Sequence, residues 1–255
     1  MKKIDVIVEA RMTSTRLPGK ILLESAGRPL LELMIERLKH FSLINDIIIA
    51  TTTNISDNTI EDLANRNDVL CFRGSENDVL GRVLNAAHKF NTNIIVQITG
   101  DMVLTDKIIS EKVINFFLNN QNDFDFVSND ASLYNDNYKQ SFPNGFNTKV
   151  YTTALLAKVA NETNHPVDRE HVVNYILKNY KNYRIHNFEA ENSYRRTDLR
   201  LTLDYPEDYK VINCIYEALY PINPNFTALD IFNFLDENPD IKKINANCTQ
   251  AKYLY

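Results

Sequence analysis

Cysteine is rare in this chain, and its spacing excludes two classes of protein. There are three cysteines among 255 residues, and Cys71, Cys214 and Cys248 lie far apart with no Cys-x-x-Cys pair. The five histidines likewise show no His-x-x-x-His spacing. We therefore expect neither a disulfide framework nor a zinc site, and these residues are typical of ordinary thiols in a reducing compartment.

Long apolar runs and an excess of positive charge are also missing. No run reaches the roughly eighteen apolar residues that span a membrane. The net charge is −5, and because a nucleic-acid-coating protein needs a basic surface, that class is excluded. We expect a soluble, cytoplasmic protein with no nucleic-acid or membrane partner.

Glycine is scarce, with six residues in the chain, where an average frequency of about 7% would give roughly eighteen. Several of the six, including Gly19, Gly74 and Gly100, stand beside the most polar motifs. Such placement indicates points where the backbone turns sharply or approaches a ligand. Apolar residues are plentiful at 44%, enough for a large core.

Strand and helix patterns alternate over the first 130 residues. Short apolar runs are typical of strands buried on both faces, and residues at helical spacing follow each run. This order predicts an α/β protein with a mostly parallel, twisted sheet. The expected strands are 4–9, 46–51, 69–72 and 93–98, and the expected helices are 31–41, 56–66, 79–87 and 106–119.

The pattern loosens after residue 123, and no Pro-, Gly- or Ser-rich linker separates the halves. We therefore expect one domain over 1–255, with a substrate-binding region appended to the alternating first half. The later strands are predicted at 123–128, 146–151, 183–188 and 199–203, the loop at 129–140, and the helices at 153–163, 168–180, from Pro206 onward, and 228–237.

The connection after the first strand carries the most informative chemistry. Residues 10–20 read Ala-Arg-Met-Thr-Ser-Thr-Arg-Leu-Pro-Gly-Lys, with the cations Arg11, Arg16 and Lys20 on one loop. Guanidinium groups pair bidentately with phosphate oxygens, an ammonium adds a point charge, and backbone N–H groups complete such a site. A basic surface loop is the alternative. The position at a strand's carboxyl end favours phosphate binding.

Two aspartates follow strand patterns in the same way. Asp101 comes after residues 93–98, and Asp204 comes after residues 199–203. Ligands of open α/β sheets bind outside the carboxyl ends of the strands, so the two carboxylates can meet on one Mg²⁺, which prefers oxygen ligands. The alternative is that each aspartate caps the helix or turn that follows it.

Two further polar clusters are candidates for substrate contacts. In residues 72–82, Ser75 and Asp78 match a helix capping box, which leaves Arg73, Gly74 and Arg82 for a possible nucleobase slot. In the later half, Arg169, Glu170 and His171 open a predicted helix, and a lone histidine there is more often structural than functional.

Taken in order, these motifs resemble a known family. Residues 10–20 and 72–82, Thr99-Gly-Asp101, residues 142–151, Arg169-Glu-His171 and residues 201–208 are similar to cytidylyltransferases of the spore-coat-polysaccharide SpsF type. That family is related to the synthetases that activate 3-deoxy-manno-octulosonate and acylneuraminates with CTP. The resemblance covers roughly residues 4–220 and implies a nucleotide-diphospho-sugar transferase (GT-A-like) fold.

The resemblance also implies an activity. The enzyme would be an Mg²⁺-dependent nucleotidyltransferase that moves CMP from CTP to an anionic sugar, sugar acid, or sugar or alditol phosphate, releasing pyrophosphate, in surface polysaccharide or glycan biosynthesis. The resemblance also implies a homodimer. It divides the domain into a nucleotide-binding half at about 1–130, an acceptor-binding and dimerisation region at about 131–225, and a C-terminal helix and tail at about 226–255. The catalytic residues would be Arg11, Arg16, Lys20, Asp101 and Asp204, of which Asp101 and Asp204 would bind the metal.

The remaining implied contacts divide between the two substrates. The nucleotide would be bound by Ala10, Arg11, Met12, Thr13, Ser14, Lys20, Thr51, Gly74, Ser75, Arg82, Thr99 and Asp101. The acceptor would be bound by Asn147, Lys149, Arg169, Glu170 and His171.

Three positions depart from the family pattern. Glu9 stands where the family usually has Gln, which adds a negative charge beside the phosphate loop. Met102-Val103 replaces the common Cys-Pro after the metal-binding aspartate. Asn147-Thr-Lys149 replaces Asp-Val-Glu in the region expected to face the acceptor, so Lys149 suits a more anionic acceptor.

Two other functions compete with this interpretation. A glycosyltransferase of the same fold class that consumes a nucleotide sugar would need an Asp-x-Asp metal motif, and Asp123-Phe-Asp125 has that spacing. It lies in a strand pattern, however, where alternation alone produces it. A non-catalytic nucleotide-binding protein is the third hypothesis, and only Glu9 and the altered acceptor region favour it.

Overall fold

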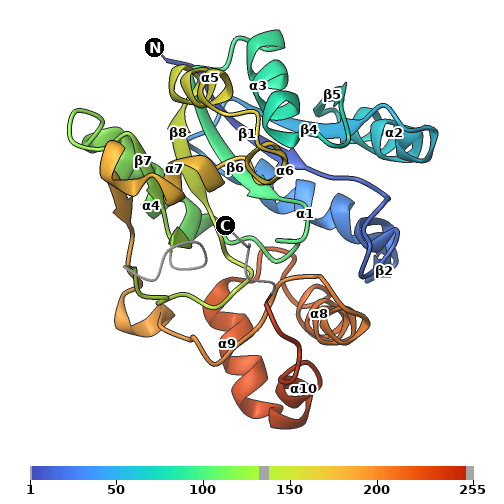
Figure 1. The fold of residues 1–255 in the computed structure, drawn as a ribbon. Coiled ribbons are helices and arrows are strands. Elements are labelled where there is room, and N and C mark those ends of the chain that lie inside the picture. Colours follow the sequence, from blue (N-terminus) through green and yellow to red (C-terminus); the bar gives the residue numbers. More distant parts are fainter. Residues whose placement is uncertain (1, 132–137, 251–255) are drawn as a thin grey trace.

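The computed structural model describes residues 2–131 and 138–250, and within them a twisted sheet lies between two layers of helices (Figure 1). The central sheet has the strand order β5-β4-β1-β6-β8-β7-β9. Its strands are β1 Ile4–Glu9, β4 Asp46–Thr52, β5 Leu70–Gly74, β6 Ile94–Thr99, β7 Phe126–Ser128, β8 Lys149–Thr152 and β9 Ile185–Asn187. A short hairpin, β2 Glu24–Ser25 and β3 Arg28–Pro29, stands apart from it.

The sheet is mostly parallel, as predicted. Strands β5, β4, β1 and β6 pair in parallel, β8 is antiparallel to both of its neighbours, and β7 and β9 are parallel to each other. Strand β1 therefore ends between β4 and β6, with all three carboxyl ends at one edge of the sheet. This edge is where a ligand site of an open α/β sheet is expected.

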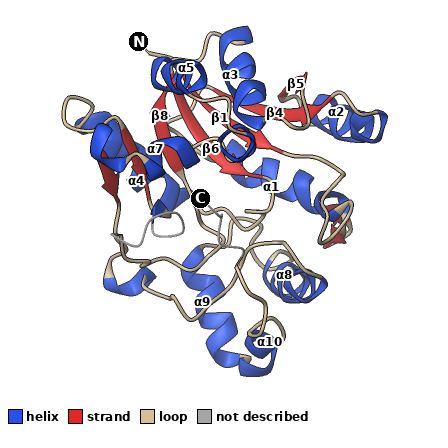
Figure 2. Cartoon of the chain, in the orientation of Figure 1, coloured by secondary structure: helices blue, strands red, loops and turns tan. Residues whose placement is uncertain are grey.

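Helices cover both faces of the sheet (Figure 2). Helices α1, α2 and α4 pack on the face that carries Val6 and Val8, and α3, α5 and α7 pack on the face that carries Ile7. The helices are α1 Leu30–Lys39, α2 Asn58–Arg66, α3 Val79–Lys89, α4 Lys107–Asn119, α5 Thr153–Glu162, α6 Pro166–Glu170, α7 Asn174–Lys178, α8 Pro206–Leu219, α9 Ala228–Glu237 and α10 Pro239–Lys243. None of the described helices is long and apolar enough to cross a bilayer.

A second apolar cluster joins α8 and α9 to the sheet layer, below it in Figure 1. It includes Leu30 and Leu33 from α1 and Val103 and Leu104 from the segment after β6. The hydroxyl of the fully buried Tyr216 on α8 donates to the Val103 carbonyl oxygen at 2.7 Å. These contacts fix α8 against the segment that follows β6.

The prediction of a strand at 199–203 is wrong. In this segment only an isolated bridge forms, between Arg200 and Asn144, while Leu199, Leu201 and Leu203 are buried in the cluster with α8 and α9. Their alternation reflects packing on helices instead of membership of a sheet. The extended segment nevertheless leads to Asp204, because the Leu203 amide donates to the Asp101 carbonyl oxygen at 3.0 Å.

The predicted helix 168–180 is also wrong in its continuity, since the structure divides it into α6 and α7. His171 leaves the helical conformation with ψ 82°. Between the two helices the buried Asp168 carboxylate accepts a hydrogen bond from the side-chain Nδ2 of Asn174 at 2.6 Å. The other predicted elements agree to within a few residues, although the expected strand 123–128 begins only at Phe126. Part of the predicted loop 129–140 lies outside the described residues.

Candidate active site

The loop after β1 closes on itself. The Gly19 amide donates to the Met12 carbonyl oxygen at 2.9 Å, and Gly19 has φ +69°, a left-handed conformation that favours glycine. A short 3₁₀ helix, Lys20–Leu22, follows directly. The Met12 amide donates in turn to the Asp57 carboxylate at 2.9 Å, which anchors the loop to the segment after β4.

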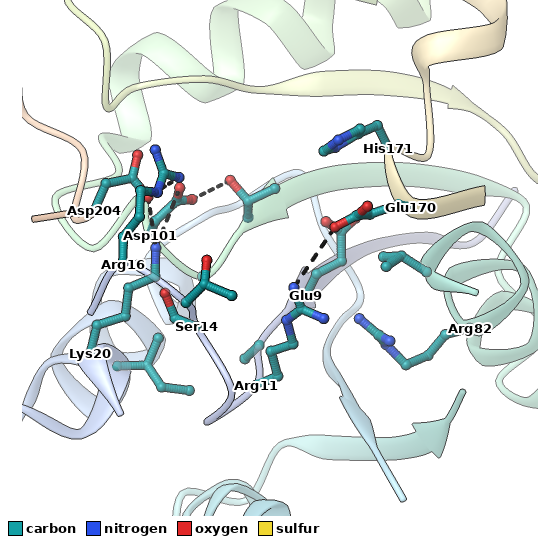
Figure 3. Close-up of a pocket in the computed structure, with 16 residues that line it drawn as sticks. Glu9, Arg11, Ser14, Arg16, Lys20, Arg82, Asp101, Glu170, His171 and Asp204 are labelled. Carbon is teal, nitrogen blue, oxygen red and sulfur yellow. Dashed lines mark hydrogen bonds and ion pairs between the residues drawn. The ribbon is translucent and has the colours of Figure 1, made fainter. Parts of the chain in front are cut away.

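A cavity of ≈ 260 Å³ lies over this loop at the carboxyl edge of the sheet (Figure 3). Its walls combine side chains from segments far apart in the sequence. The predicted nucleotide, phosphate and metal residues that line it are Ala10, Arg11, Ser14, Arg16, Lys20, Arg82, Thr99, Asp101 and Asp204. The predicted acceptor residues that line it are Glu170 and His171.

Asp101 and Asp204 meet at the ammonium group of Lys20. The Lys20 Nζ lies 3.0 Å from Asp204 Oδ1 and 3.8 Å from Asp101 Oδ2, and it donates to the Leu203 carbonyl oxygen at 2.6 Å. Arg16 Nη2 lies 2.8 Å from the same Asp204 oxygen. The two acids predicted to bind a metal therefore converge, with cations of the first loop between them.

The Asp204 carboxylate does not cap a helix, so that alternative is excluded for this residue. Asp208 performs the capping: its Oδ2 accepts from the amides of Asp204 and Tyr205, each at 3.0 Å. Arg200 forms ion pairs with Asp208 and Asp204, at 2.9 Å from Asp208 Oδ1 and 3.3 Å from Asp204 Oδ2. Asn245 donates to Asp208 Oδ1 at 2.9 Å. This network fixes the direction in which Asp204 points.

The donor set fits a magnesium ion. Burial opposes ionisation of Asp101, but the neighbouring Lys20 charge and the hydrogen bond from the Thr99 hydroxyl hold its pKa below the ordinary value. Its carboxylate is therefore available as an anion. Among the described residues no group of three or more His, Cys, Asp or Glu side chains gathers to hold a metal. Two carboxylates suit Mg²⁺, which usually keeps several waters and binds substrate phosphates as well.

Several predicted nucleotide contacts lie outside the cavity. Thr51 is fully buried, and its hydroxyl donates to Asp57 Oδ2 at 3.0 Å. The Thr13 hydroxyl donates to Glu76. Met12 contributes its backbone to loop closure.

Gly74 ends β5 and also lies outside the cavity lining. An added Cβ there would meet Phe72 and Arg82 side-chain atoms at 3.0 Å, so packing explains why this residue is a glycine.

The capping box predicted for Ser75 and Asp78 is wrong. Asp78 itself is the N-cap of α3, with its Oδ1 accepting from the Gly81 amide at 2.8 Å. The Ser75 hydroxyl accepts from the Asp78 amide at 3.1 Å and lies outside the cavity. Arg73 donates to Glu61 at 2.9 Å and does not line the cavity.

The predicted acceptor residues separate into two groups. Glu170 and His171 line the cavity, and burial lowers the pKa of His171. Arg169 instead binds Asp78 at 2.8 Å. Asn147 and Lys149 are buried and do not line the cavity, and Lys149 Nζ lies 2.9 Å from Asp130 Oδ2.

Sequence reasoning missed other residues of the site. Ile21 and Val79 line the cavity without having been proposed, whereas Thr15 and Gly100 line it from within motifs that were already singled out. The sequence could have indicated Asp57 as a residue that supports the site, because it follows β4 as Asp101 follows β6. Asp208 lies within the motif 201–208 that was already singled out. No sequence pattern indicated Arg200.

The Asp123-Phe-Asp125 motif lies far from this chemistry. Asp125 precedes β7, whose direction matches that of β6, so it lies at the amino edge of the sheet, opposite the cavity. Its carboxylate is bound by Arg184, with Oδ2 3.2 Å from Nε. The motif therefore gives no support to a glycosyltransferase metal site.

The fold and this site define a nucleotidyltransferase of the nucleotide-sugar transferase type, and comparison with known proteins identifies the family. The cytidylyltransferase family model matches residues 6–225. A solved cytidylyltransferase from Leptospira borgpetersenii serovar Hardjo-bovis is 33% identical with a TM-score of 0.87, covering 98% of this chain and 100% of that one. The chain belongs to the cytidylyltransferase family and is an enzyme of that class.

Two more distant similarities extend the comparison. The spore coat polysaccharide biosynthesis protein SpsF of Bacillus subtilis is 28% identical over 245 residues, which cover 94% of this chain and 97% of that protein. A CMP:2-keto-3-deoxy-manno-octonic acid synthetase, solved in complex with CTP, has a TM-score of 0.62 at 15% identity, covering 84% of this chain and 98% of that one. The second likeness bears on the fold alone.

Proposed function

We propose that this enzyme is an Mg²⁺-dependent cytidylyltransferase that transfers CMP from CTP to an anionic sugar, sugar acid, or sugar or alditol phosphate, releasing pyrophosphate. The observation that carries the proposal is the convergence of Arg16 and Lys20 with Asp101 and Asp204 at the carboxyl edge of the sheet. The similarity to a polysaccharide biosynthesis protein supports a role in surface polysaccharide or glycan synthesis.

In this reaction an acceptor oxygen attacks the α-phosphorus of the nucleotide, and the bond to pyrophosphate breaks. Arg11, Arg16 and Lys20 hold the triphosphate and neutralise charge on the leaving pyrophosphate, as in other phosphoryl transfers that depend on positioning and electrostatics. Asp101 and Asp204 are the residues that would hold Mg²⁺. When bound, the ion supplies charge neutralisation and orientation of the phosphates.

The other cavity residues divide between the two substrates. Ala10, Ser14, Thr99 and Arg82 line the part of the cavity proposed for the nucleotide, while Glu170 and His171 line the part proposed for the acceptor. No strong general base is required, because a carboxylate or phosphate acceptor is already ionised. The proposal includes a homodimer in the cytoplasm, an expectation that rests on the family resemblance.

A pyrophosphate-release screen tests the proposal directly. Each of four nucleoside triphosphates is mixed with sugar acids, sugar phosphates and alditol phosphates, with Mg²⁺ and with EDTA. CTP with one acceptor class should release pyrophosphate only when Mg²⁺ is present. Release that persists in EDTA would remove the metal, and preference for another nucleotide would remove CTP from the proposal.

A further inference from the structure

Glu9 occupies a distinctive place in the cavity. It is the last residue of β1, opposite Thr99 of β6, and it lines the cavity at the end that carries Arg82 and His171 (Figure 3). Asp101 and Asp204 lie at the other end, with Arg16 and Lys20. Glu9 therefore lies away from the two acids proposed to hold the metal, in the part of the cavity that Glu170 and His171 also line.

A chain of hydrogen bonds fixes the orientation of the Glu9 carboxylate. The register pairs Ile7 with Gln97 and Gln97 with Lys149, and since side chains alternate along a strand, Glu9 and Gln97 share one face of the sheet with Tyr151. The fully buried Tyr151 hydroxyl donates to Gln97 Oε1 at 2.7 Å. The Gln97 amide nitrogen therefore faces Glu9 and donates to Glu9 Oε1.

The second carboxylate oxygen of Glu9 is the one left for a ligand. Within the described part of the chain, no hydrogen bond to Glu9 Oε2 is formed. The buried setting raises the pKa of Glu9, while the nearby Lys149 and Arg82 charges act against that rise. Both cations have other partners: Lys149 binds Asp130 at 2.9 Å, and Arg82 donates to the Ser75 carbonyl oxygen.

We propose that Glu9 determines acceptor specificity by accepting a hydrogen bond from a hydroxyl or amino group of the acceptor. The inference rests on the proposed function and refines it. The ionised group of the acceptor faces the α-phosphorus that it attacks, whereas the group over Glu9 is a hydrogen-bond donor. A carboxylate or phosphate at this position would face a like charge in a partly dehydrated site, which is costly. The Gln that usually occupies this position in the family would not impose that discrimination.

A pair of probes that differ in one group tests the assignment. D-ribitol 5-phosphate carries a terminal CH₂OH where D-ribonate 5-phosphate carries a carboxylate. Binding of each probe is measured by calorimetry to the wild type, to Glu9→Gln, and to the control Glu61→Gln, which removes one negative charge near Arg73 and outside the cavity. The thermal unfolding midpoints of the three proteins are compared to verify that each is folded.

The wild type should bind the alditol phosphate more tightly, and Glu9→Gln should reduce that preference about tenfold, in line with a hydrogen bond to a charged group. The control should keep the wild-type preference. Where turnover is measured, the KM for the acceptor should change in Glu9→Gln while the KM for CTP stays within about twofold. Equal binding of the two probes by the wild type, or binding of neither, overturns the assignment, as does a preference that Glu9→Gln leaves unchanged.

The binding measurement also separates this inference from the proposed function. Absence of pyrophosphate release with every nucleotide would refute the cytidylyltransferase proposal. A preference for the alditol phosphate that depends on Glu9 would still support the assignment, because calorimetry does not require turnover. Conversely, full CMP transfer with no effect of Glu9→Gln on the probe preference would refute the role of Glu9 alone.

Discussion

Asp204 shows how much one side chain depends on its neighbours. Its carboxylate is almost fully buried at 2% exposure and forms ion pairs with Arg16, Lys20 and Arg200. A buried carboxylate without such partners would be costly, so the aspartate is stable at this position only with cations beside it.

The sequence could predict that Asp101 and Asp204 meet, because each follows an extended segment that ends at the same edge. The sequence could not predict that Thr51 lies outside the cavity, because the burial of its hydroxyl depends on the hydrogen bond to Asp57.

Replacement of either acid by its amide tests the site at this scale. Asp101→Asn and Asp204→Asn should each lower kcat by about 10²–10³, the usual cost of losing one group that stabilises charge in a transition state. The measurement is steady-state pyrophosphate release at saturating CTP. Asp198→Asn serves as the control, since Asp198 binds Arg196 and Lys242 outside the cavity. Near-normal turnover in either site variant would contradict the assignment.

At the scale of the elements, loops are held by acids that bridge segments. Asp106 is the N-cap of α4, with Oδ1 accepting from the Ile109 amide at 2.9 Å. Its Oδ2 accepts from the Ala228 amide at the start of α9 at 2.8 Å. The pattern of α4 could be predicted from periodicity, but this second contact joins residues far apart in sequence. For the same reason the segment 199–203 was predicted as a strand, since the sequence does not show which partner buries its leucines.

Asp106→Ala should therefore lose two caps at once. Each cap contributes typically about 1 kcal/mol, so we expect a destabilisation of about 2–3 kcal/mol with two buried amides left unpaired. Urea unfolding followed by circular dichroism measures it. Thr227→Ala, which removes only the side-chain cap of α9, should cost about half as much. Equal losses in the two variants would show that Asp106 supports a single helix.

Asp57 joins the loop 10–20 to the segment after β4, and its titration provides a second test. Burial opposes ionisation, but hydrogen bonds from Thr52, Met12 and Thr51 lower its pKa. A carboxyl with a lowered folded-state pKa contributes stability that is present above its unfolded pKa of about 3.9 and is lost as the pH falls below it. Asp57→Asn should therefore lose stability at pH 6 and show a smaller further loss between pH 4 and 3 than the wild type, by urea unfolding.

The exposed Asp240 provides the matched control for this experiment. Asp240→Asn should reproduce the wild-type dependence on pH. The interpretation fails if the Asp57 and Asp240 variants lose stability in parallel over the acid range.

On the scale of the whole molecule, the residues of the site are positioned partly by the core around the sheet and partly by the apolar cluster around α8 and α9. The sheet positions Asp101 and the loop 10–20. Helices α8 and α9 bring Asp204 to them through packing on α1 and on Val103 and Leu104. The alternation of strands and helices in the first half could be predicted from the sequence, because each element shows its own hydrophobic periodicity over a short stretch of chain. The placement of the second cluster depends on long-range burial, which periodicity does not encode.

The position of Lys20 between the two acids has a consequence for ion affinity. In the proposed metal site, this ammonium group would compete with a divalent ion for the two carboxylates. Lys20→Met should therefore bind Mn²⁺ more tightly than the wild type in the absence of nucleotide, by about tenfold if the coupling falls in the common 5–150-fold range. Electron paramagnetic resonance of free Mn²⁺ measures this affinity. The same variant should hold CTP less well, so that one substitution improves retention of the ion while it impairs the enzyme, and an unchanged or weaker Mn²⁺ affinity would show that the lysine is not a competitor.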